Sequence, residues 1–279
     1  YINIYYKRIE MKINWFPGHM NKALKDIENQ LKKVDVIIYV LDARIPVSSL
    51  NPSLSKIAEN KPILYLINKI DLADEKRVRE LLSNFQGEGK DYLLFNSTTF
   101  KSDLVISKIK KLAKAKIDKY MNKGLKATIR VMVVGVPNSG KSSLVNNLCK
   151  KAKTVTGNKA GVTKSGQWLN VGDGIEIYDT PGTLYPNIEN QDIAKKLAFV
   201  GSVRDEVLEF ISLAEELFAL IKEKYPEFLE KRYPNCKNIE DIAKLRKYVT
   251  SGGEVDLERA SFSFVDDFRK TRIGKITLD

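Results

Sequence analysis

Gly135-Val-Pro-Asn-Ser-Gly-Lys-Ser142 fits the pattern G-x-x-x-x-G-K-[ST], which is typical of loops that bind the phosphates of a nucleotide. An apolar run over residues 129–134 precedes it and a helix-forming stretch follows it. Its glycines let the backbone turn tightly and bring N–H groups against phosphate oxygens, and the following helix directs its positive end to the same place. We therefore predict phosphate contacts from Gly135, Val136, Pro137, Asn138, Ser139, Gly140, Lys141, Ser142 and Ser143. Lys141 is expected to reach the β and γ phosphates, and Ser142 to hold magnesium.

The rest of the chain predicts a doubly wound α/β sheet followed by a smaller all-α domain. Apolar runs indicate buried strands at 36–41 and 62–67, further strands at 92–95 and 129–134, and a hairpin over 168–178. Helices are expected between the strands, including a single lysine-rich helix over 102–121. From residue 187 onward, helical stripes occur without strands. The predicted parts are an N-terminal extension at 1–11, an α/β domain at 12–186 and a helical domain at 187–279.

A second motif, Asn68-Lys-Ile-Asp71, stands at the end of the second predicted strand. A carboxylate at position 71 can accept two hydrogen bonds from the N1–H and the exocyclic amine of guanine, an edge that adenine lacks. Asn68 is expected to bridge the base edge and the phosphate loop, and the aliphatic stem of Lys69 to lie on the purine face. The motif therefore predicts selection of guanine.

A third motif, Asp179-Thr-Pro-Gly182, ends the second arm of the predicted hairpin. Asp179 is expected to supply a carboxylate to the surroundings of the magnesium ion, and the N–H of Gly182 to sense the γ phosphate. Thr163 is the preferred candidate for a threonine that closes on magnesium, with Thr154 and Thr156 as rivals.

The charge of the chain is concentrated in one segment. The net charge is +12, and residues 101–170 carry fifteen Lys and one Arg against Asp103 and Asp118. Clustered lysines gain affinity for phosphate polymers by releasing counterions, so the segment predicts a polyanion partner; a solvated lysine face is the alternative. Cys149 and Cys236 stand far apart, which favours a reducing compartment, and no apolar run reaches the roughly 20 residues of a membrane helix. We expect a soluble cytoplasmic protein without a membrane partner.

The guanine motif comes before the phosphate loop, the reverse of the order in ordinary GTPases. Together with Trp15-Phe-Pro-Gly-His-Met20, Asp42-Ala-Arg44 and Gly252-Gly-Glu-Val-Asp-Leu-Glu-Arg259, this circularly permuted order resembles the ribosome biogenesis GTPase A family over residues 12–279. The resemblance implies a permuted GTPase domain that binds GTP or GDP with Mg²⁺, hydrolyses GTP slowly, is stimulated by the ribosomal particle, and acts in assembly of the large ribosomal subunit.

The resemblance also implies partners and further site residues. The partners are the large-subunit precursor, its ribosomal RNA and its proteins, bound through the helical domain, and the protein is expected to be a monomer off the ribosome. Asn96 and Ser97 stand where many GTPases have Ser-Ala, in a loop that contacts guanine mainly through backbone N–H groups. The helical domain begins a few residues after Gly182, so the GTP state is expected to dock on the particle and hydrolysis to release it.

The residues that would promote hydrolysis are less clearly marked. Thr183 follows Asp-Thr-Pro-Gly, so the glutamine that orients water in many GTPases is missing. His19, the only histidine, lies in a segment that resembles the family's catalytic-histidine motif and is expected to act with Lys141; a capping or packing role is the alternative. Asn138 matches the position at which related potassium-dependent GTPases hold a K⁺ ion, the alternative being a turn asparagine. An RNA-binding scaffold with a barely hydrolysing nucleotide site is the competing interpretation of the whole chain.

Overall fold

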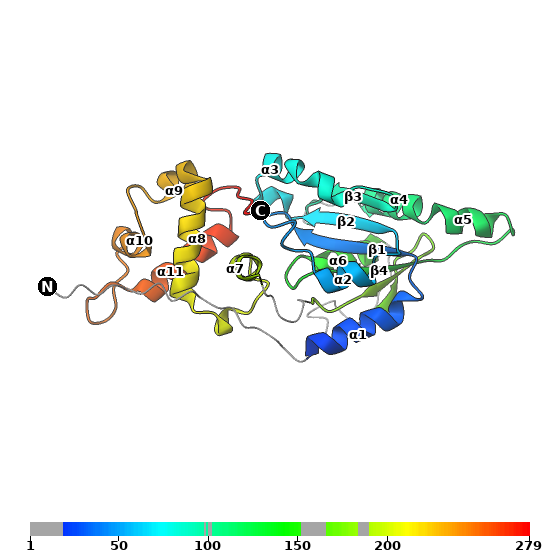
Figure 1. Cartoon of the computed structure of the whole chain (residues 1–279), viewed down its shortest axis with the longest axis horizontal. Helices are drawn as coiled ribbons and strands as arrows, with labels where there is room; N and C mark the ends of the chain where they lie inside the picture. The colour runs from blue at the N-terminus through cyan, green and yellow to red at the C-terminus, as the bar shows by residue number, and fades with distance from the viewer. Residues whose placement is uncertain (1–18, 98, 100–101, 152–165, 184–189) are drawn as a thin grey trace. The chain divides into compact units, whose positions relative to one another are not determined.

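The computed structural model describes residues 19–97, 99, 102–151, 166–183 and 190–279, and only the backbone of residues 19–23, 150 and 151. These residues form two compact units (Figure 1). The sheet unit comprises the described parts of Phe16–Pro186 together with Lys275–Asp279, and the helical unit comprises those of Asn187–Gly274. No helix in the described part of the chain is long and apolar enough to cross a membrane.

The sheet unit is built on six strands in the order β3-β2-β1-β4-β6-β5. They are β1 (Val36–Asp42), β2 (Ile63–Asn68), β3 (Lys90–Leu94), β4 (Ile129–Val134), β5 (Gln167–Asn170) and β6 (Ile175–Asp179). All neighbours pair in parallel except β5, which is antiparallel to β6. The chain runs outward from β1 to β3 and resumes at β4 on the other side of β1. The strand order therefore reverses between β1 and β4, where doubly wound sheets hold their ligands.

Helices cover both faces of the sheet, as predicted. One face packs against α4 (Ser102–Leu112) and α6 (Lys141–Lys151), through a core that includes Ile109, Val133 and Leu144. The other face packs against α1 (His19–Leu31), α2 (Pro52–Ile57), α3 (Glu75–Glu80) and the short helix η2 (Leu82–Phe85). Because β1 and β2 are buried on both faces, their residues are apolar without alternation. The α/β prediction is confirmed.

The lysine-rich segment differs from its prediction. Instead of one helix over 102–121 it forms α4 and α5 (Lys114–Met121), which meet at Ala113. α4 buries Val105, Ile106 and Ile109, whereas α5 buries no residue. The apolar face that would fix one straight helix on the sheet ends at Ala113, and the helix breaks there.

The helical unit contains no strand among its described residues. Its helices are α7 (Gln191–Phe199), η3 (Asp205–Val207), α8 (Phe210–Lys224), α9 (Pro226–Arg232), α10 (Ile239–Leu245) and α11 (Leu257–Arg269). Asp267 of α11 is fully buried and accepts hydrogen bonds from Arg232, Arg246, Arg272 and the hydroxyl of Tyr233. Burial alone would raise the pKa of Asp267, but these donors outweigh it and lower the pKa from 3.8 to about 2. One carboxylate thus joins α9, α10 and α11.

The last five residues of the sequence pack on the sheet unit, although the prediction assigns them to the helical domain. The N–H of Leu278 donates to the carbonyl of Arg44 at 2.7 Å. The carboxylate of Asp279 accepts from the N–H groups of Val47 and Ser48 at 2.8 and 2.9 Å. The helical unit is therefore connected to the sheet unit by the chain at both of its ends.

Candidate nucleotide-binding site

Strand pairing brings the predicted motifs to one edge of the sheet. In the register of β1 and β2, Asp42 lies opposite Asn68, and in that of β4 and β6, Val133 lies opposite Asp179. β1 also pairs with β4. The carboxyl ends of four neighbouring strands therefore meet where the phosphate loop begins, and this edge is the candidate site.

Asn68 connects the guanine motif to the phosphate loop directly. Its Nδ2 donates to the backbone carbonyl of Ser139 at 2.8 Å, and its Oδ1 accepts from the N–H of Ser97 at 3.1 Å. The side chain is fully buried. Two segments that are far apart in the sequence are thus fixed against each other by one amide.

The backbone of the phosphate loop needs its glycines. Gly135 and Gly140 have φ angles of 151° and 101°, and Asn138 lies in the left-handed region with φ 59°. A Cβ at position 140 would collide with the side-chain amide of Asn68, so glycine there permits the contact between the two motifs. α6 begins at Lys141, and the N–H groups of its first turn have no partner within the helix.

Lys141 lies beneath this loop. It is only 6% exposed, and its Nζ donates to the carbonyls of Gly135 and Val136 at 3.1 and 2.8 Å. Burial lowers the pKa of its ammonium group from 10.5 to about 8, although the nearby carboxylate of Asp179 acts in the opposite direction. A phosphate bound next to Lys141 would stabilise its charged form and so raise the pKa that burial lowers.

The segment from Asp179 to Thr183 packs against the same loop. The N–H of Thr183 donates to the carbonyl of Gly135 at 3.2 Å. A Cβ at Gly182 would lie 2.8 Å from Cα of Pro137, so only glycine fits without a shift. Asp179 and Thr183 are both fully buried. The third motif therefore reaches the phosphate loop as closely as the guanine motif does.

A group of charged residues that the prediction leaves without a role supports Lys69. The backbone of Lys69 is left-handed, and its Nζ donates to Asp42 Oδ2 at 2.8 Å and to the carbonyl of Asn138 at 2.6 Å. Arg44 makes a buried ion pair with the same carboxylate at 2.7 Å. Burial alone would raise the pKa of Asp42, but Arg44 and Lys69 together hold it well below its usual value. The one signal in the sequence is an Asp-Ala-Arg at a strand end.

The remaining guanine residues lie around Asn68. Asp71 is exposed in the short helix η1 (Ile70–Leu72), and Asn96 and Ser97 are half-buried after β3. Asn147 of α6 donates to the carbonyl of Ser97 at 2.8 Å. Because the N–H of Ser97 already bonds to Asn68, Ser97 fixes that amide in place.

Two of the three residues predicted to serve magnesium are described. Ser142 is half-buried in the first turn of α6, and Asp179 ends β6. Hydroxyl and carboxylate oxygens suit Mg²⁺. The described residues contain no group of three or more His, Cys, Asp or Glu that could hold a metal. This donor set fits an ion whose other ligands are phosphate oxygens and water.

Other predicted residues lie outside the described part of the chain. These are Thr163, its rivals Thr154 and Thr156, and the extension at 1–11. His19 is the first residue of α1, but only its backbone is described. Their predicted roles stay predictions.

Comparison with known proteins gives consistent matches. A family profile described as "50S ribosome-binding GTPase" matches residues 130–243. Ribosome biogenesis GTPase A of Bacillus pumilus is 36% identical, over 96% of this chain and 99% of its own. Mitochondrial ribosome-associated GTPase 1 of Xenopus tropicalis is 31% identical, over 95% of this chain and 94% of its own. The crystal structure of GNP-bound YlqF from T. maritima has a TM-score of 0.67 and 28% identity, and the match covers 92% of this chain and 97% of that one.

Proposed function

Because this chain belongs to the ribosome biogenesis GTPase A family, we propose that it binds and hydrolyses GTP as an assembly factor for the large ribosomal subunit. The observation that carries the proposal is the hydrogen bond from Asn68 to the carbonyl of Ser139, since it joins a guanine-selecting motif to a phosphate-binding loop. We interpret the order of these motifs as a circular permutation of the GTPase domain.

In the proposed complex, each motif has one task. The loop at 135–143 and the N–H of Gly182 bind the phosphates, with Lys141 countering their charge. Asp71 reads the guanine edge, Lys69 lies along the base, and the loop at Asn96 and Ser97 supports them. A magnesium ion held by Ser142, with Thr163 and Asp179 nearby, would supply charge stabilisation for phosphoryl transfer.

Two further groups are proposed to promote hydrolysis. Asn138 would hold a potassium ion against the phosphates, in place of an arginine finger, a group worth about 10³ to 10⁵ in rate where one is used. His19 would orient the attacking water once the particle is bound. Sodium in place of potassium should slow hydrolysis, and His19→Ala should lose particle-stimulated turnover while it keeps its affinity for GTP. Equal rates in the two salts, or full stimulation of His19→Ala, would remove the respective role.

The nucleotide is proposed to control docking on the particle. The chain enters the helical unit directly after the segment that contains Gly182 and returns to the sheet unit at Lys275. A change at the γ phosphate would thus act on the helical unit, which we propose contacts ribosomal RNA and proteins. We expect the GTP state to bind the precursor of the large subunit, with a coupling of about 1–3 kcal/mol. We also propose that the protein is cytoplasmic and that it is a monomer when it is not bound to the ribosome.

Steady-state GTP hydrolysis with and without large-subunit particles tests the proposal. We expect a slow basal rate that rises when the particles are added, and tighter particle binding with a non-hydrolysable GTP analogue than with GDP. An RNA-binding scaffold with a structural nucleotide is the alternative from another class. It predicts negligible turnover, no stimulation and equal affinity in both nucleotide states.

A further inference from the structure

The strongest feature outside the nucleotide site is a lysine-rich surface around α5. Residues 102–128 contain eight lysines and two aspartates. Lys108 and Lys116 form ion pairs with Asp91 and Asp35. Several exposed residues here make no ion pair with any described residue. We call them the amino-end surface, after the end of the sheet at which the parallel strands begin: Lys114, Lys119, Lys123, Lys126, Tyr120, Met121 and Leu125. Asp118 of α5 is also exposed among them, so four lysines stand against one carboxylate and the surface keeps an excess of positive charge.

Packing of the sheet unit does not explain this surface. α5 buries no residue, and Ile117 is its one partly buried apolar contact with the core. Tyr120, Met121 and Leu125 are 36%, 67% and 56% exposed. A helix that buries so little gains little from the fold itself. A partner that offers both phosphates and flat apolar groups would match the lysines and these apolar side chains together.

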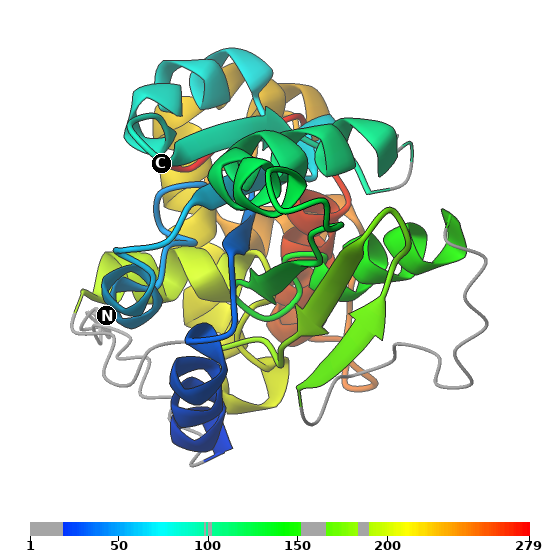
Figure 2. The ribbon, with the colours of Figure 1, turned by 90° about the vertical axis from the view of Figure 1, so that its right-hand side faces the viewer.

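The amino-end surface lies far from the nucleotide site. Nζ of Lys116 is 2.7 Å from Asp35 Oδ2 and 2.7 Å from the carbonyl of Thr128, and these two residues precede β1 and β4. The phosphate loop follows the other end of β4, six residues on, or about 20 Å away along the strand. Figure 1 shows α5 beyond the end from which β1 and β2 start, and Figure 2 turns that end toward the viewer. A partner bound here leaves the nucleotide site open.

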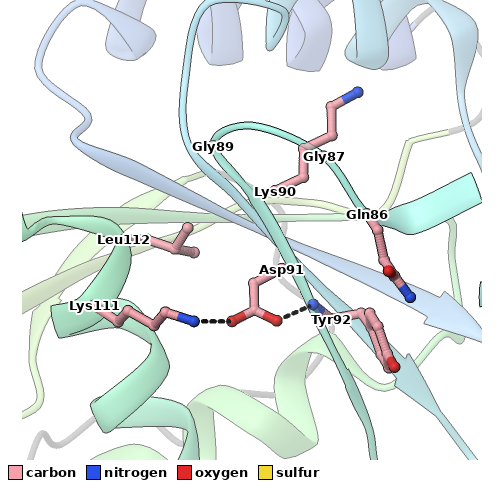
Figure 3. A pocket seen from close by; sticks show the side chains of 8 residues that line it. All are labelled: Gln86, Gly87, Gly89, Lys90, Asp91, Tyr92, Lys111 and Leu112. Atoms are coloured by element: carbon pink, nitrogen blue, oxygen red, sulfur yellow. Dashed lines mark hydrogen bonds and ion pairs between the residues drawn. The ribbon is translucent and has the colours of Figure 1, made fainter. Parts of the chain in front are cut away.

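A shallow pocket adjoins the surface and extends its positive charge. It has a volume of about 540 Å³ and is lined by residues of β3, the turn before it and the end of α4 (Figure 3). Asp91 at its centre holds Lys111 at 3.7 Å, while the side chain of Lys90 points away from that carboxylate. Lys90 opens β3 at the same amino end of the sheet. The basic area thus continues past α5 to the edge strand.

We propose that the amino-end surface binds the phosphate backbone of structured RNA, while Tyr120, Met121 and Leu125 contact its bases or sugars. Lysines act as point charges on phosphates, and aromatic rings stack on bases in a sequence-tolerant way. The choice of RNA over other polyanions rests on the proposed function. The surface belongs to the sheet unit, so it is a contact in addition to the one proposed for the helical unit.

The test compares two double variants of the full chain with equal charge change. Lys119→Gln with Lys123→Gln removes charge from the amino-end surface, and Lys56→Gln with Lys76→Gln removes the same charge from exposed positions of α2 and α3. Binding of a labelled RNA duplex is measured by fluorescence anisotropy across a potassium chloride series. The slope of log affinity against log salt should become shallower by about 2 for the first variant, one for each lysine, and stay unchanged for the second.

The outcomes separate this proposal from the proposed function. Equal slopes for the first variant and the wild type, or equal losses in both variants, would overturn it. If the first variant lost binding to phosphatidylserine vesicles while its RNA binding stayed unchanged, the proposal would be overturned in favour of a membrane surface. GDP affinity equal to wild type in both variants shows that they are folded. If the first variant has the shallower slope but the wild type shows no particle-stimulated hydrolysis, the proposed function is refuted and the amino-end surface is supported.

Discussion

Replacing Asn68 by alanine is the sharpest perturbation of the proposed site. The substitution removes the donor to the carbonyl of Ser139 and the acceptor of the N–H of Ser97, at 2.8 and 3.1 Å. Asn68 is fully buried and Ser139 is 1% exposed, so water has little access to either group in the intact fold. The two loops keep their contacts with Lys69 and Asn147 but lose the amide that links one to the other.

The magnitude follows from the two lost hydrogen bonds. A buried polar group left without its partner costs about 1–3 kcal/mol, and this applies to the carbonyl of Ser139. The N–H of Ser97 is only partly buried, so its loss adds less. Relaxation of the loops reduces the loss of stability but leaves a site that nucleotide binding must re-form. Since 1.4 kcal/mol is a factor of ten, we expect at least about a tenfold loss of GDP and GTP affinity together with a lower melting temperature.

Titration of a fluorescent GDP analogue and thermal denaturation of the same preparations provide the assay. Asn84→Ala is the matched control, because its amide donates at 2.9 Å to the carbonyl of Leu81 at an exposed position of the same unit. Exposed substitutions of this kind stay within about 0.5 kcal/mol. If Asn68→Ala bound both nucleotides like the control and melted at the same temperature, the two motifs would not form one site.

Three further predictions concern other parts of the chain. Because burial lowers the pKa of Lys141 to about 8, GTP binding should take up protons above that pH, and calorimetry in buffers of different ionisation enthalpy should detect the uptake. The stability of the nucleotide-free protein should rise as pH rises from 8 toward 10.5, since the unfolded chain holds more protons there. No uptake would show that Lys141 is already charged without nucleotide. Asp267→Ala should cost about 1–3 kcal/mol, because the buried hydroxyl of Tyr233 loses its acceptor, whereas the arginines are partly exposed to solvent. In the wild type the contribution of Asp267 should persist above pH 3.8 and be lost as pH falls toward about 2. Denaturation that is unchanged by the substitution would contradict this prediction. Asp279→Ala should destabilise the sheet unit by up to about 3 kcal/mol, because it removes a carboxylate that accepts backbone N–H bonds. Glu88→Ala, at an exposed position, should melt like the wild type. Equal melting temperatures of the two variants would refute the contact of Asp279 with the backbone of Val47 and Ser48.

The local sequence pattern was sufficient to predict an element of the fold where one physical requirement, such as burial of a strand on both faces, determines the residues. β1 and β2 are buried on both faces, and only continuous apolar runs satisfy that environment. The phosphate loop was found because its glycines adopt φ angles that other residues resist. The break at Ala113 was missed, since lysine and alanine favour a helix on both sides of it and only the end of the buried face on α4 separates the two helices.

Contacts between distant segments could not be predicted in the same way. The position of Asp279 on the loop after β1 depends on where the helical unit returns the chain, which no local pattern records. Likewise, Asp42 and Lys69 meet because β1 and β2 pair in one register, with Asp42 opposite Asn68. The guanine motif was predicted from Asp71 and Asn68, but its support by Asp42 was visible only in the assembled sheet.

The central claim is that the motif with Asp71 and the loop with Lys141 enclose one guanosine triphosphate. Competition between GTP and XTP for the Asp71→Asn variant tests it most directly. The amide loses the paired acceptor for the guanine edge and gains a donor for the C2 carbonyl of xanthine, so we expect the wild type to prefer GTP and the variant to prefer XTP, with phosphate binding intact. A variant that still prefers GTP as strongly as the wild type would contradict the account.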